Sequence, residues 1–158
     1  MHRATLTLCS ALAMFALLST GCTASTDDDE ADVTGNTDDA LTGSFVARGT
    51  GYYPDPSALE GGYNDRKGKP LTTLQQFLAG DADYVAVAMD STAFKYGQRL
   101  RIRELESKYG RSIVFRVVDT GGAFRGKGRT RIDICTKNQQ ASLDPTINGL
   151  LHIDALAD

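Results

Sequence analysis

Three aspartates stand at the end or in the middle of apolar stretches of the kind that form buried strands. Asp90 follows the run 85–89, Asp119 ends the run 113–118, and Asp133 lies between two isoleucines. Carboxylates are rare at such positions unless they are solvated or used. Side chains alternate along a strand, so if the isoleucines fill the core, Asp133 points outward to a surface or groove. Two such carboxyl groups close together can act as general acid and base, because one charge keeps the other group protonated.

Thr120, Gly121 and Gly122 directly follow Asp119 and indicate a turn. Paired glycines permit positive φ angles and let a ligand approach the backbone closely, so we expect these three residues to bind substrate. The competing interpretation is structural. Asp90 and Asp119 could each cap a turn, with the carboxylate accepting a hydrogen bond from its own backbone two residues on.

Cys135 and His152, with Asp154 close by, raise the alternative of a thiol nucleophile activated by histidine, as in a wall-peptide amidase. Cys135 lacks the helix N-terminus that would make its thiol more acidic, and His152 lies in an apolar stretch where a structural histidine is commoner. No spacing of His, Cys and Asp indicates a zinc site. We expect neither a metal nor a cofactor.

From Phe45 onward the chain carries six short β-forming stretches and one clear helix signal. Apolar residues at helical spacing, a threonine cap and Gly80 as the stop predict a helix that ends at Ala79. Six short strands must form a sandwich or close on themselves to remove their edges, and a small barrel is the economical answer. The expected strands are 45–53, 84–89, 99–103, 113–118, 131–135 and 150–153.

The ordered aspartates and their flanking residues resemble the three-aspartate (3D) domain family. The resemblance is carried by Asp90, by Asp119-Thr120-Gly121-Gly122-Ala123-Phe124-Arg125-Gly126 and by Arg131-Ile132-Asp133, and it covers roughly Gly49 to Cys135. The family includes the catalytic barrel of a membrane-bound lytic transglycosylase and the stationary-phase muralytic factors. The resemblance implies a mainly β fold, a six-stranded double-psi β-barrel with one or two short helices.

The same resemblance implies peptidoglycan glycan strands as the partner and cleavage of the bond between N-acetylmuramic acid and N-acetylglucosamine. Carried over, Asp133 matches the catalytic acid and base, Asp119 the neighbouring catalytic carboxylate, and Asp90 completes the cluster as a substrate-binding residue. The C6 hydroxyl of the sugar then attacks in place of water and yields a 1,6-anhydro product. The segment between Asp119 and Asp133 is longer than the family usually shows.

The chain is also expected to lack the second domain that forms the glycan groove of the transglycosylase. A cleft must therefore come from the loop 52–70 and the barrel rim, where Tyr52, Tyr53 and Tyr63 either stack on sugars or pack. Double-psi barrels also occur in expansin-like proteins that bind or loosen glycans without clear hydrolysis. A non-catalytic glycan-binding module is the alternative function.

The first 21 residues are expected to be a signal peptide, because a short basic start precedes an apolar stretch too short to span a bilayer. Ser19-Thr20-Gly21-Cys22 resembles a lipobox, which predicts lipidation of Cys22 and an anchor in the cell envelope, in the outer membrane if the cell has one. The competing expectation is cleavage after Ala24 and secretion. Membrane contact would come only through the lipid anchor.

Residues 22–44 hold seven acids and no base, with almost nothing apolar, and are expected to be a disordered tether. Residues 45–158 hold 16 basic and 13 acidic residues, with no basic run among aromatics that would indicate nucleic acid. Cys135 is the one cysteine in this part of the chain, so the domain has no internal disulfide. We expect a monomer.

Overall fold

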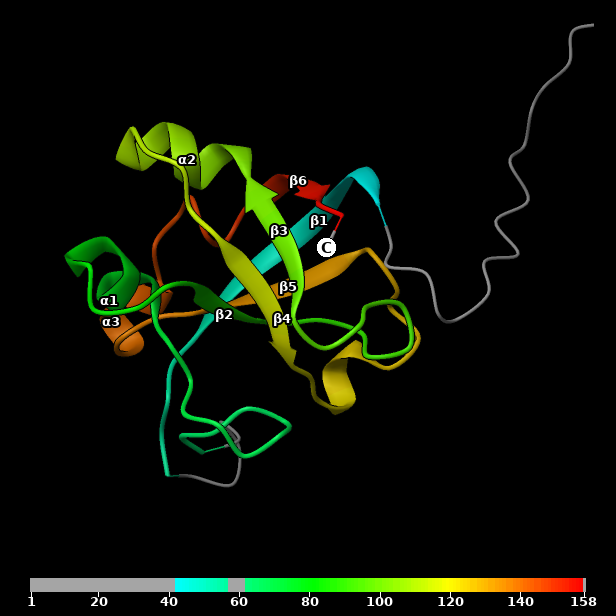
Figure 1. Cartoon of the computed structure of the whole chain (residues 1–158), viewed down its shortest axis with the longest axis horizontal. Coiled ribbons are helices and arrows are strands. Elements are labelled where there is room, and N and C mark those ends of the chain that lie inside the picture. Colours follow the sequence, from blue (N-terminus) through cyan, green and yellow to red (C-terminus); the bar gives the residue numbers. More distant parts are fainter. Residues whose placement is uncertain (1–41, 57–61, 158) are drawn as a thin grey trace, which may run out of the picture. The chain divides into compact units, whose positions relative to one another are not determined.

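The computed structural model describes residues 42–56 and 62–157, which form a closed barrel of six strands (Figure 1). All six predicted strands are present, and the mainly β barrel is confirmed. The first strand begins two residues before Phe45. The strands are β1 Gly43–Tyr52, β2 Val85–Ala88, β3 Gln98–Ile102, β4 Phe115–Asp119, β5 Arg131–Cys135 and β6 Leu150–Ala155.

The predicted signal peptide, its lipidation site Cys22 and most of the predicted tether lie outside the described residues. Among the residues that are described, no helix has the length and apolar character needed to cross a membrane.

The strand order around the barrel is β1-β5-β2-β4-β3-β6. β1 pairs with β5 and β2 pairs with β4 in parallel, whereas the other neighbours are antiparallel. If β1, β2 and β3 change places with β4, β5 and β6 respectively, the order around the closed barrel stays the same. Parallel pairs remain parallel and antiparallel pairs remain antiparallel. Two interleaved halves related in this way are the double-psi arrangement, so the predicted fold class is confirmed.

Alternate residues of the strands fill the barrel interior. Ile132 and Ile134 are fully buried in the main core, as their alternation with Asp133 predicted. A smaller apolar cluster lies on the outer face of β2, β4 and β5, where Ala86, Val118 and Cys135 pack against Leu71 and several tyrosines. The stretch that contains Leu71 thereby holds the preceding loop against the outside of the barrel.

In the described part of the chain three short helices accompany the strands, one more than the upper number predicted. α1 (Leu74–Ala79) has the predicted threonine cap and Gly80 stop, with Thr73 and Gln76 forming a capping box. α2 (Arg103–Tyr109) and α3 (Gln139–Ser142) were not predicted. Because α2 begins directly after β3, the predicted strand 99–103 ends one residue early, at Ile102.

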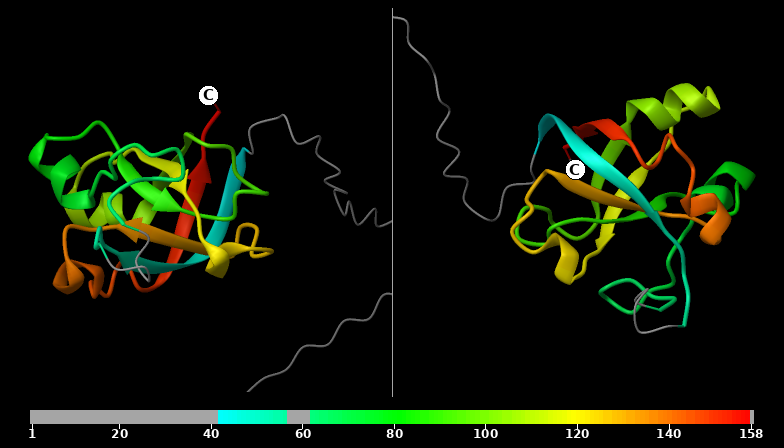
Figure 2. Two further views of the ribbon diagram at one scale, coloured as in Figure 1. Left: turned by 90° about the horizontal axis from the view of Figure 1, so that it is seen from below. Right: turned by 180° about the vertical axis from the view of Figure 1, so that it is seen from behind.

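The segment 62–70 and the 3₁₀ turn η1 (Gly122–Phe124) lie at the end of the barrel opposite α2 (Figures 1 and 2). The loop is organised by two isolated bridges, between Asp55 and Gly62 and between Asn64 and Pro70. This end of the barrel therefore carries the irregular segments that can form a site.

β1 passes very close to other backbone segments at two glycines. A Cβ atom at Gly51 would lie 2.5 Å from the carbonyl oxygen of Ser142, and one at Gly49 would lie 2.2 Å from that of Ile147. Only glycine fits at such distances, so the segment that links β5 to β6 can cross β1.

We expect Gly51→Ala to lower the free energy of unfolding by about 1–3 kcal/mol, because the backbone of Ser142 must move to admit a methyl group. Chemical denaturation followed by circular dichroism measures the change. Gly149→Ala is the matched control, since its Cβ would make only an ordinary contact of 3.5 Å. Equal losses in the two variants would contradict the close-packing argument.

Candidate functional site

A cleft of about 590 Å³ opens beside η1 on the outer face of the barrel. The loop residues 64–66 form one wall, and the segment 119–124 forms another. Ala88 and Asp133, from β2 and β5, also line it. The two aspartates predicted to be catalytic, Asp119 and Asp133, thus share one cleft.

Backbone pairing places the two aspartates on either side of one small residue. Ala88 pairs with Asp119 of β4 on one flank and with Asp133 of β5 on the other. Adjacent strands lie about 4.8 Å apart, so the two aspartate Cα atoms are roughly 10 Å apart with only a methyl group between them. Thr50 of β1 pairs with Asp133 and extends the same row.

A β-bulge turns Asp119 toward this row. Val87 pairs with Val117, but the next residue of β2, Ala88, pairs with Asp119, so Val118 is an extra residue in β4. Val117 is part of the main core and Val118 of the outer cluster. Strict alternation would then turn Asp119 into the barrel, and the bulge instead places it on the outer face.

Asp119 is partly exposed and accepts a hydrogen bond of 2.8 Å from the backbone amide of Thr120. Burial raises the pKa of Asp119, the Thr120 amide lowers it, and the negative charge of Asp65 raises it again, with a net upward shift. Asp119 therefore keeps its proton to a higher pH than a free aspartic acid.

Asp133 is held by two neighbours. Arg131 donates to its two oxygens, with both distances 3.2 Å, and the hydroxyl of Thr50 also donates to it. The guanidinium of Arg131 lies 5.1 Å from the ring centre of Phe124, another residue of the cleft wall. Asp133 is thus a positioned, ion-paired carboxylate.

Sequence reasoning missed a third acid in the cleft, Asp65. It is buried and accepts from the backbone amides of Lys67 and Lys69, at 2.8 and 2.9 Å, and from the hydroxyl of Tyr96. Burial raises the pKa of Asp65, but these three donors outweigh it and lower the pKa overall. Asp65 therefore carries a fixed negative charge that acts on Asp119.

Asp90 lies outside the cleft lining, although it was predicted to bind substrate. Its buried carboxylate accepts from the amide of Gly128 at 2.9 Å and from the amide and hydroxyl of Thr92 at 3.0 and 2.8 Å. The Gly128 amide, followed by the two Thr92 donors, lowers the pKa of Asp90 to about 2. Asp90 therefore caps the turn that contains Thr92. Its bond from Gly128 also holds the loop that leads into β5.

Thr120, Gly121 and Gly122, which were predicted to bind substrate, line the cleft. Neither glycine adopts the positive φ angle that its lack of a side chain permits: Gly121 is extended, with φ −169°, and Gly122 has no positive φ either. A Cβ at Gly122 would meet nothing within 4 Å. Because the two glycines have no side chains, this part of the cleft wall is bare backbone.

The thiol alternative does not fit the geometry. Burial raises the pKa of the Cys135 thiol to about 12. His152 is exposed, with its Nδ1 2.6 Å from Glu104. Cys135 pairs with Tyr52 and His152 with Val46, six residues apart on β1, or roughly 20 Å at the strand rise. These two side chains cannot form a nucleophile and base pair.

No protein-family model matches the chain, and no curated protein matches it. Within residues 42–56 and 62–157, no group of three or more His, Cys, Asp or Glu residues is arranged to hold a metal ion. The chemistry of the cleft, together with the motif resemblance, is therefore the basis for inferring function.

We expect Asp90→Asn to destabilise the protein at pH 7 by about 1–2 kcal/mol. The folded pKa of about 2 lies below the ordinary value of 3.8, so the stabilisation is present above pH 4 and is lost as the pH falls toward 2. Denaturant unfolding of the parent and the variant at several pH values measures it. A difference that stays constant from pH 7 to pH 2 would contradict this role.

We expect Asp65→Asn to lower the pKa of Asp119, because it removes the negative charge that opposes ionisation of the neighbouring carboxyl. Carbon-13 NMR of the aspartate carboxyl groups during a pH titration measures the change. Tyr96→Phe is the control, since it removes a hydrogen bond to Asp65 but leaves the charge. An unchanged Asp119 pKa in folded Asp65→Asn would rule out this electrostatic coupling.

Proposed function

We propose that this protein cleaves peptidoglycan glycan strands in the manner of a lytic transglycosylase, at the bond between N-acetylmuramic acid and N-acetylglucosamine. The observation that carries the proposal is the placement of Asp119 and Asp133 on either side of Ala88 in one cleft. Their environments differ, because the pKa of Asp119 is raised and Asp133 is ion-paired with Arg131. The resemblance to the three-aspartate domain family supports the same reaction.

Asp119 is the proton donor in this proposal. Glycosidic cleavage requires a carboxylic acid that is protonated near neutral pH, and the raised pKa of Asp119 favours that form. This assignment exchanges the roles that the resemblance implies, in which Asp133 is the acid and base. Asp133, fixed by Arg131 and Thr50, instead stabilises the positive charge that develops at the anomeric carbon.

The steps balance with a single proton carrier. Asp119 gives its proton to the glycosidic oxygen as the bond from the muramic acid C1 to that oxygen breaks. The C6 hydroxyl of the same muramic acid then attacks C1, and its proton returns to Asp119. The products are a 1,6-anhydro end and a free N-acetylglucosamine end, and the enzyme is regenerated without water.

The walls of the cleft suit a sugar ring. Its volume of about 590 Å³ is in the range of small-ligand sites, and Ala88, Gly121 and Gly122 leave room beside the acids. The Nη1 atom of Arg66, a residue of the cleft wall, is buried and has no hydrogen-bond partner in the described part of the chain. A polar ligand would satisfy this group.

Action on the cell wall requires export, and the signal peptide expected in residues 1–21 would supply it. We propose lipid anchoring through Cys22, with secretion after cleavage at Ala24 as the other route. The domain would bind the glycan strand as a monomer.

A non-catalytic, expansin-like binding module is the second candidate. It is favoured by one observation, that both carboxylate oxygens of Asp133 already accept hydrogen bonds from Arg131. The residue that the resemblance makes the acid and base is thus held as an ion pair, which suits binding and not proton transfer.

We expect the parent protein to release soluble anhydro-muropeptides from purified sacculi and Asp119→Asn to do so about 10²–10⁴ times more slowly. Asp133→Asn should also be slow, because it removes the stabilising charge. Activity should fall as the pH rises through the elevated pKa of Asp119. Mass spectrometry of the released fragments gives the rates.

Asp83→Asn is the matched control, since Asp83 is exposed and lies outside the cleft. Its rate should equal that of the parent. Digestion by Asp119→Asn as fast as the parent would refute the proposed mechanism, and binding to sacculi without any anhydro product would favour the binding module.

A further inference from the structure

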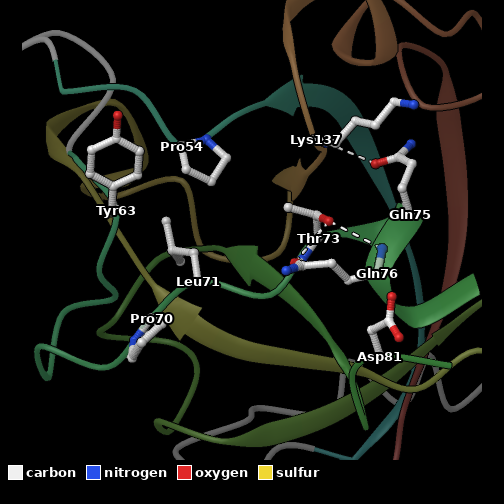
Figure 3. Close-up of a pocket in the computed structure, with 9 residues that line it drawn as sticks. All are labelled: Pro54, Tyr63, Pro70, Leu71, Thr73, Gln75, Gln76, Asp81 and Lys137. Atoms are coloured by element: carbon white, nitrogen blue, oxygen red, sulfur yellow. Dashed lines mark hydrogen bonds between the residues drawn. The ribbon is translucent and has the colours of Figure 1, made fainter. Parts of the chain in front are cut away.

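A second hollow has a volume of about 550 Å³, and Figure 3 shows the residues that line it. The two recesses share their dividing segments. Tyr63 lines the hollow and the next residue, Asn64, lines the cleft, while Tyr52 of β1 lines the cleft and Pro54 lines the hollow. Consecutive Cα atoms are 3.8 Å apart, so the linings of the two recesses adjoin along both segments.

The hollow has an apolar side and a polar side. Pro54, Leu71 and the ring of Tyr63 face it from one side, and Tyr63 is 57% exposed (Figure 3). Lys137, Asp81 and two glutamines face it from the other side. An exposed aromatic ring opposite charged and amide groups is typical of a binding surface for a ligand with both apolar and polar parts.

The two glutamines present hydrogen-bond donors to the hollow. The side-chain oxygen of Gln75 accepts from the backbone amide of Lys137 at 2.8 Å, and that of Gln76 accepts from the backbone amide of Thr73, also at 2.8 Å. Only the oxygen of an amide can accept, so these bonds fix which end of each side chain is occupied. Among the described residues, neither amide NH₂ group has a hydrogen-bond partner.

The donors outnumber the acceptors on this side. Gln75, Gln76 and Lys137 bring two amide NH₂ groups and an ammonium to this side of the lining, whereas Asp81 alone offers a carboxylate. Sugar hydroxyls both donate and accept hydrogen bonds, so a sugar site needs acceptors as well as donors. Carboxylates and peptide carbonyls only accept, so a site for them needs mainly donors. This polarity, with the apolar side opposite, fits a short peptide that has carboxylates, small apolar side chains and one amine.

We propose that the hollow binds the stem peptide that branches from the muramic acid held in the cleft. This inference rests on the proposed function, because the branch reaches the hollow only when the glycan occupies the cleft. The peptide carboxylate meets Lys137, its backbone carbonyls meet Gln75 and Gln76, its methyl groups pack on Tyr63, and its amine meets Asp81.

The test compares three soluble ligands by isothermal titration calorimetry: a disaccharide carrying its stem peptide, the same disaccharide without the peptide, and the free peptide. We expect the peptide-bearing disaccharide to bind the parent most tightly. Lys137→Ala should weaken that binding about tenfold, since it removes a charge-assisted hydrogen bond. The same variant should leave binding of the peptide-free disaccharide unchanged.

Lys95→Ala is the matched control, because it removes the same charge outside both recesses. Tyr63→Ala is a second probe, as its exposed ring can be removed without opening the core. Both Lys137→Ala and Tyr63→Ala should weaken binding of the free peptide, and Lys95→Ala should not.

The outcomes separate this inference from the proposed function. If both disaccharides bind equally and Lys137→Ala changes neither, the hollow is not a peptide site, although glycan cleavage stands. If the free peptide binds and is weakened by Lys137→Ala while sacculi are not cleaved, the peptide site stands and the activity is wrong. If no ligand binds the parent, both are overturned.

Discussion

The extra residue at Val118 decides which face of the barrel Asp119 occupies, and the candidate site depends on it. Without the bulge, Asp119 would follow Val117 and Val118 by strict alternation and turn toward the packed interior. With it, the carboxyl lies in the row that already contains Asp133. The double-psi order is what makes the row, because it places β2 directly between β4 and β5.

The electrostatics of the cleft follow from an unequal distribution of hydrogen-bond donors. Asp65 accepts from two amides and a tyrosine hydroxyl, and Asp133 accepts from Arg131 and Thr50. Asp119 has one backbone amide. Tyr52 and Arg66 also lower the pKa of Asp119, but burial and the negative charge of Asp65 outweigh them and favour its protonated form.

Much of the fold could be predicted because the strand and cap signals are local, whereas the site depends on contacts between distant segments. Alternation around Asp133 correctly placed the isoleucines in the core and the carboxylate outside. Asp90 and Asp119 both end apolar runs and look alike in sequence. They differ because Gly128, 38 residues away, donates to Asp90. Asp65 lies in a loop without periodicity, so no sequence pattern distinguished it.

The loop 62–71 contributes residues to both recesses, so a movement of the loop would affect both. It supplies Asp65 to the cleft and Tyr63 to the hollow, and Leu71 anchors it in the outer apolar cluster with Val118. Asp65 is itself fixed by its bond to Tyr96, which lies in the same cluster. Any displacement of this loop therefore moves the charge that sets the proton affinity of Asp119. A ligand that braces the loop from the hollow would keep that charge in place, and so peptide binding and proton transfer would depend on the same few contacts.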